Sequence, residues 1–105
     1  SGFDFTADSF DGRETLWTEH AAEDRRIAVE ISFSLSEGKA KLVHIDSSGN
    51  VTTIIECEPE TSADGARTMT IALKEGSNRF KLVGYGCKEL DITFDYKADV
   101  ETTKR

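Results

Sequence analysis

The stretch Ile27-Ala-Val-Glu-Ile-Ser-Phe-Ser-Leu35 gives the clearest indication of secondary structure in this chain. Its apolar side chains occupy every second position, and small, polar or charged residues stand between them. A period of two is typical of a β-strand with one buried and one solvated face, whereas a helix repeats its buried positions every 3.6 residues. The stretch therefore predicts an amphipathic strand, which ends at the turn-forming residues 36–38.

The same alternation recurs along the chain and predicts about eight short strands. One segment changes phase, because Ala40 and Leu42 share one face and Val43 and Ile45 the other. A β-bulge near Leu42 and Val43 would explain the change, as would burial of both faces. The other expected strands lie at residues 69–73, 80–82, 90–96 and 51–57, with a first strand opening at Phe3 and Phe5 and a second over residues 14–21.

Short turns separate these strands. Glycine, asparagine and aspartate gather at residues 46–50, 74–78 and 84–86, and such residues adopt the backbone angles of tight turns. Many short strands joined by tight turns predict an all-β, antiparallel two-sheet β-sandwich with jelly-roll-like topology, or alternatively an immunoglobulin-like one. The length of 105 residues fits a single domain over residues 1–105.

The charge balance argues against two classes of partner. The chain has 13 Lys and Arg against 20 Asp and Glu, which gives a net charge of −7. Nucleic acids and anionic membranes bind basic surfaces, so neither is expected as a partner. No apolar run is long enough to span a bilayer, and we expect no membrane insertion by this segment.

Residues 69–96 resemble the C-terminal half of jelly-roll carbohydrate-binding modules, as found in bacterial surface proteins. The resemblance lies in Leu73, Gly76, Asn78, Phe80 and Leu82, followed by the strand over residues 90–94. It implies a non-catalytic binding module, with carbohydrate as the expected ligand, in a secreted protein or lipoprotein at the cell surface. Such modules often hold a structural calcium, for which Asp4, Asp8, Asp11 and Asp24 are candidate ligands. The alternative for these aspartates is a solvated acidic face, and no metal site or other cofactor is otherwise expected.

Three residues are candidates for ligand binding. Trp17 is the only tryptophan, and it belongs either to the core or to an exposed surface where it would stack on a sugar. Tyr85 stands between two glycines in an expected loop, which would present its ring for contact. His20 lies at the polar end of an expected strand, as does His44, and both are interpreted as surface histidines.

Cys57 and Cys87 are the only cysteines. An even number in an extracellular sandwich favours one disulfide, whereas two unpaired thiols would indicate a reducing compartment.

No nucleophile motif or metal-ligand spacing accompanies the histidines, so we expect no enzyme. The first hypothesis is an extracellular or cell-surface binding module for a glycan or a surface protein. The alternative is a structural or protein-interaction domain of a larger anchored protein of unknown function.

Overall fold

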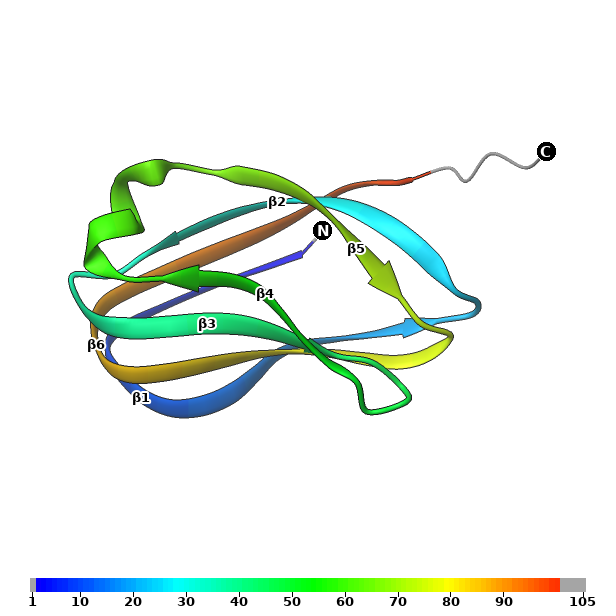
Figure 1. The fold of residues 1–105 in the computed structure, drawn as a ribbon, viewed down its shortest axis with the longest axis horizontal. Helices are drawn as coiled ribbons and strands as arrows, with labels where there is room; N and C mark the ends of the chain where they lie inside the picture. Colours follow the sequence, from blue (N-terminus) through cyan, green and yellow to red (C-terminus); the bar gives the residue numbers. More distant parts are fainter. Residues whose placement is uncertain (1, 101–105) are drawn as a thin grey trace.

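The fold is antiparallel and consists almost entirely of β-strands, as a computed structural model shows (Figure 1). The structure describes residues 2–100, with only the backbone described at residues 63 and 64. Over these residues the elements in chain order are β1 (Gly2–Ala21), β2 (Arg25–Ser34), β3 (Glu37–Ile45), β4 (Val51–Cys57), the 3-10 helix η1 (Pro59–Asp64), β5 (Arg67–Leu73) and β6 (Gly76–Asp99). The prediction of an all-β antiparallel fold is confirmed. No helix among these residues is long and apolar enough to cross a membrane.

The described strands are hydrogen-bonded into one curled sheet with β6 at its centre. The order is β4-β3-β6-β2-β5, and β1 pairs with β6 in addition. The first part of β6 pairs with β3, from Ile45 opposite Arg79 to Glu37 opposite Lys88. Its second part pairs with β2, from residue 91 onward. β6 therefore changes its neighbour on one edge, while β1 follows it along the other edge throughout.

Two pairs of expected strands are single strands in the structure. The strands expected at Phe3 and over residues 14–21 are joined in β1, and those over residues 80–82 and 90–96 are joined in β6. The glycines at 84 and 86, expected to form a turn, lie inside β6 instead. Hydrogen bonding continues through this region because β1 and β6 bend together, with a register shift between Phe10 and Gly12.

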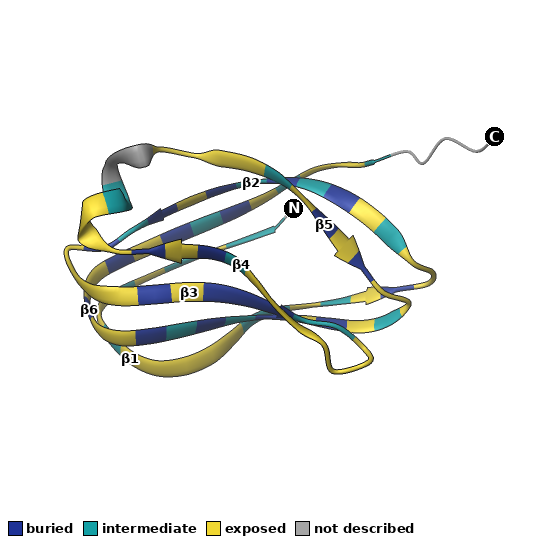
Figure 2. Ribbon diagram, in the orientation of Figure 1, coloured by how far each residue is buried: buried dark blue, intermediate teal, exposed yellow. Residues whose placement is uncertain are grey.

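The hydrophobic core lies inside the curl (Figure 2). The alternating residues of β2 supply its centre, and Ile27, Val29 and Ile31 are fully buried, as their spacing predicts. β6 contributes Phe80 and Phe94, which are buried as completely. Buried apolar residues from all six strands form one cluster, so the sheet wraps around a single core.

The register of β3 and β4 shifts between Leu42 and Val43, where a bulge is predicted, but the extra residue belongs to β4. Leu42 lies opposite Ile55 of β4 and Val43 lies opposite Thr53, so Ile54 has no partner in the register. Leu42 and Val43 are nevertheless both buried. β3 itself alternates regularly against β6 from Lys39 to Ile45, so Leu42 and Val43 point to opposite faces, and burial of both faces is the explanation that holds.

Candidate functional site

Tyr85 is the most exposed aromatic side chain of the described chain, with 72% of its surface accessible. It lies in β6 at the bend where this strand exchanges β3 for β2 as its neighbour. The side chains of β-strand residues alternate between faces, and the preceding residue, Gly84, is buried, whereas Lys39, directly opposite Tyr85 on β3, is exposed. Tyr85 therefore projects from the outer face of the sheet, as predicted from its glycine neighbours, although from a bent strand and not from a loop.

The backbone around Tyr85 is held by close contacts with both neighbouring strands. Gly38 of β3 has φ +85°, and a Cβ atom at this position would collide with the carbonyl oxygens of Tyr85 and Gly86. On the other side, the N–H of Gly86 donates a hydrogen bond of 2.8 Å to the Asp11 carboxylate of β1. Only glycine permits such an approach of two backbones, so the bend that carries Tyr85 depends on Gly38.

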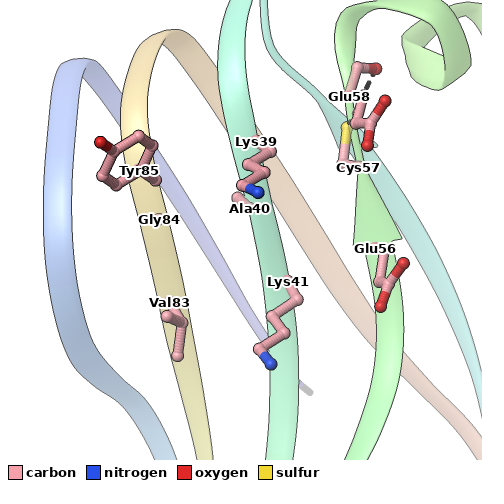
Figure 3. A pocket seen from close by; sticks show the side chains of 9 residues that line it. All are labelled: Lys39, Ala40, Lys41, Glu56, Cys57, Glu58, Val83, Gly84 and Tyr85. Carbon is pink, nitrogen blue, oxygen red and sulfur yellow. Dashed lines mark hydrogen bonds between the residues drawn. The ribbon is translucent and has the colours of Figure 1, made fainter.

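A hollow of about 290 Å³ opens beside Tyr85 on this outer face (Figure 3). Lys39 of β3 lies directly opposite Tyr85, and Lys41 lies between Val83 of β6 and Glu56 of β4. Facing residues of neighbouring strands share a face of the sheet. The hollow is therefore lined by an aromatic ring, two amines and carboxylates, together with the small residues Ala40 and Gly84 beneath them.

Trp17, the second binding candidate, packs against the core. Its ring centroid lies 5.3 Å from those of Phe80 and Phe94, and 5.9 Å from that of Phe3. The side chain is partly buried in this aromatic cluster, which agrees with the core interpretation left open by the sequence. Trp17 does not line the hollow at Tyr85.

The two histidines have different environments. His20 is exposed in β1, as predicted, and is not among the residues that line the hollow at Tyr85. The prediction that His44 lies on the surface is wrong, because its ring is only 5% exposed and stacks on Phe80 at 4.9 Å between centroids. The alternation of Ala40, Leu42 and His44 would have indicated this, since it places His44 on the inner face of β3.

The disulfide predicted between Cys57 and Cys87 is absent, because both thiols are free and buried. Cys57 lies in β4 and Cys87 in β6, and β3 runs between these two strands. Neighbouring strands are about 4.8 Å apart, so the two cysteines are separated by roughly twice that distance. A disulfide needs Cα atoms within about 7 Å. The Sγ of Cys87 instead contacts the Lys39 carbonyl of the intervening strand at 3.2 Å.

The aspartates proposed as calcium ligands are dispersed. Asp11 and Asp24 accept backbone hydrogen bonds from Gly86 and Glu75, and all four aspartates are exposed. No group of three or more His, Cys, Asp or Glu side chains that could hold a metal ion occurs among the described residues.

One carboxyl group and one phenol group on the surface have shifted pKa values. Burial by itself raises the pKa of Asp46, but hydrogen bonds from Asn50 and Ser48 and the charge of His44 together bring it below its ordinary value. The hydrogen bond from the Tyr96 hydroxyl to Asp99, 3.0 Å long, raises the pKa of Tyr96. Neither group lines the hollow at Tyr85, so these shifts concern stability and not the candidate site.

Comparison with known proteins gives one partial similarity. No family model matches the chain. Over 45 residues it is 42% identical to a fatty acid-binding protein of Lepidoglyphus destructor, a stretch that covers 42% of this chain and 34% of that protein. The matched part of the chain thus spans about a third of the length of this relative.

Proposed function

We propose that this domain is a non-catalytic binding module of an extracellular or cell-surface protein, and that it recognises carbohydrate at Tyr85. The observation that carries the proposal is the exposed ring of Tyr85 beside polar side chains over a shallow hollow. An exposed aromatic ring stacks on the apolar face of a sugar, while lysine and glutamate side chains hydrogen-bond its hydroxyl groups. The extracellular location rests on the sequence resemblance, since the free thiols lend it no support.

The finer part of the fold prediction belongs to the same proposal. We interpret the curled sheet as a jelly-roll-like sandwich, in which β1 and β6 each cross from one layer to the other at the bend near Tyr85. The change of neighbour along β6, from β3 to β2, supports this interpretation. An immunoglobulin-like sandwich is the alternative, and it would be favoured by an experimental structure with strands that end at the bend.

The absence of catalysis is also proposed. A histidine that activates a side-chain nucleophile lies within hydrogen-bond reach of it. Among the described residues, no serine, threonine or cysteine side chain is hydrogen-bonded to His20 or His44, and His44 is instead paired with Asn78. This arrangement supports a binding role for the domain.

Glycan-array screening followed by calorimetry tests the proposal. We expect binding to at least one glycan, a loss of about tenfold or more in Tyr85→Ala, and retention in Tyr85→Phe, because one stacked ring contributes about 1–2 kcal/mol. Val51→Ala is the matched control, since Val51 is also an exposed apolar residue of the sheet at 64%. Absence of binding to every glycan, or equal losses in both alanine variants, would overturn the proposal.

Fatty-acid binding is a second candidate, which the partial similarity to a fatty acid-binding protein favours. The interior of the curl is occupied by Phe80, Phe94 and Leu82, which are fully buried, so an acyl chain would have to displace core side chains. Titration with a fluorescent fatty acid separates the two candidates. Saturable binding that Tyr85→Ala leaves unchanged would favour the lipid ligand over the glycan.

A further inference from the structure

Basic side chains gather on the outer face of β3, β6 and β1, around the proposed glycan site. Val83 of β6 has Lys41 opposite it on β3 and Arg13 opposite it on β1. Tyr85, two residues further along, has Lys39 opposite it. Facing residues share one side of the sheet, so these three cations border Val83 and Tyr85 from both neighbouring strands.

This basic face contrasts with the charge of the whole chain. Lys81, two residues before Val83, belongs to the same face by alternation, so four of the 13 basic residues gather there. The other nine basic residues stand against 20 acidic ones, so the rest of the chain is acidic on balance. A local concentration of cations on an acidic protein attracts an anionic ligand selectively to that face.

The two lysines of the hollow have no carboxylate partner. Elsewhere, Lys97 and Arg25 are paired with Glu30 and Asp99 at 3.4 and 3.3 Å. No described carboxylate lies within 4.0 Å of the amine of Lys39 or Lys41, although Glu56 faces Lys41 across the strands. Both amines are therefore available to a ligand.

Resting on the proposed function, we infer that the ligand is an acidic glycan, a sugar chain that carries carboxylate groups. A carboxylate of the sugar binds Lys39 and Lys41, which are two residues apart on β3 and so separated by about 7 Å along the strand. The ring of the same or a neighbouring sugar stacks on Tyr85. Arg13 and Lys81 extend the attractive face beyond Val83 for further residues of the chain.

Two glutamates, Glu56 of β4 and Glu58 directly after this strand, favour a sugar over other polyanions. Glu56 and Glu58 border the hollow on the side away from Tyr85 (Figure 3). Their carboxylates accept hydrogen bonds from sugar hydroxyl groups and repel every anionic group, so they disfavour a ligand with closely spaced charges and no free hydroxyl groups, such as a DNA backbone. A ligand that has both hydroxyl groups and spaced carboxylates matches the succession of acidic, basic and aromatic side chains across β4, β3 and β6.

Paired ligands with the same sugar backbone test this inference. Polygalacturonate and its methyl ester differ only in whether the carboxylates are free, and alginate and hyaluronate broaden the acidic panel. We expect the native protein to bind an acidic member about tenfold or more tightly at low salt than the methyl ester, and this preference to shrink as salt screens the charges. In the double variant with Lys39→Gln and Lys41→Gln the preference should disappear, whereas Lys97→Gln, which removes an exposed lysine elsewhere, should keep it.

The outcomes separate the inference from the proposed function. Equal binding of acid and methyl ester, unchanged in the double lysine variant, would overturn the inference and leave the glycan site at Tyr85 standing. No binding to any sugar in the panel would overturn both. Binding of duplex DNA or phosphatidylserine vesicles as tightly as the acidic sugars would overturn the assignment to a sugar. Unchanged thermal unfolding of the exposed-lysine variants verifies that each has folded.

Discussion

The Nε2 atom of His44 lies 2.9 Å from the Oδ1 atom of Asn78, and both side chains are buried. Oδ1 of Asn78 also accepts the N–H of Lys74 at 3.1 Å, so it is the acceptor in both bonds and His44 donates through Nε2. The amide nitrogen of Asn78 donates to the carbonyls of Lys74 and Gly76. This polar pair therefore joins β3 to the turn between β5 and β6.

Removing the Asn78 amide should destabilise the protein strongly. Asn78→Ala leaves buried partners without hydrogen bonds, and we expect a loss of about 2–4 kcal/mol in the free energy of unfolding. Urea denaturation measures it. Asn50→Ala, at an exposed turn, is the control and should cost less than about 1 kcal/mol. Equal losses in the two variants would show that the buried network contributes nothing particular.

Asp46 should make stability depend on pH in acid. Its pKa is lowered in the folded protein, where the N–H groups of Ser48 and Asn50 donate to its carboxylate at 2.8 and 3.0 Å. The resulting stabilisation is present above the unfolded pKa of about 3.9 and is lost as pH falls through the lower folded value. In Asp46→Asn the melting temperature should fall less steeply below about pH 4. Parallel curves for the two proteins would contradict this.

Gly38 should tolerate no side chain. Gly38→Ala places a Cβ against the backbone carbonyls of Tyr85 and Gly86, so it should destabilise the protein and displace the bend. Gly49 has a similar φ of +86° but open space around its Cβ position. Gly49→Ala should therefore show only the backbone strain, about 1–2 kcal/mol. Thermal unfolding of both variants separates the cost of the collision from that of backbone strain. A smaller loss of stability in Gly38→Ala than in Gly49→Ala would contradict the predicted collision.

Both cysteines should be unpaired and inaccessible to thiol reagents in the native protein. Cys57 and Cys87 are at most 2% exposed, so a maleimide should label neither in the native protein and both after denaturation without reductant. The intact mass should be the same with and without reductant. A loss of two hydrogens in the oxidised sample would mean that β3 does not separate the cysteines as described here.

Trp17 should contribute to stability and not to glycan binding. Its ring fills part of the cluster with Phe3, Phe80 and Phe94, and Trp17→Ala should cost roughly 2–4 kcal/mol, since the side chain is only partly buried. Trp17→Phe should retain most of that stability. If Trp17→Phe instead weakens glycan binding as much as Tyr85→Ala does, the binding site lies elsewhere.

Much of the fold follows from local patterns in the sequence. The alternation from Ile27 to Leu35 predicts which side chains of β2 are buried, and the glycine and asparagine at residues 49 and 50 predict the β3–β4 turn. The change of phase at Leu42 and Val43 reflects burial of both faces of β3, one of the two explanations that the sequence offers. Each of these is a property of a few neighbouring residues, because strand side chains alternate whatever the strand pairs with.

The candidate site was only partly visible in the sequence. Tyr85 could be singled out because two glycines flank it, whereas Lys39 and Lys41 gave no signal of their own. They reach the site because β3 pairs with the first part of β6. The glycines at 84 and 86 are predicted to form a turn, but glycine occurs in turns and in bent strands alike, so the sequence does not distinguish the two.

Alternation of apolar and polar residues is a local property, so it suffices to predict that the chain forms strands and which face of most strands is buried. Which strands are neighbours depends on contacts between distant parts of the chain. The placement of β3 between β4 and β6 keeps Cys57 from Cys87 and brings Lys39 to Tyr85, and the pairing of β3 with β6 stacks His44 on Phe80. Such pairings join residues far apart in the chain, and no short stretch of sequence encodes them.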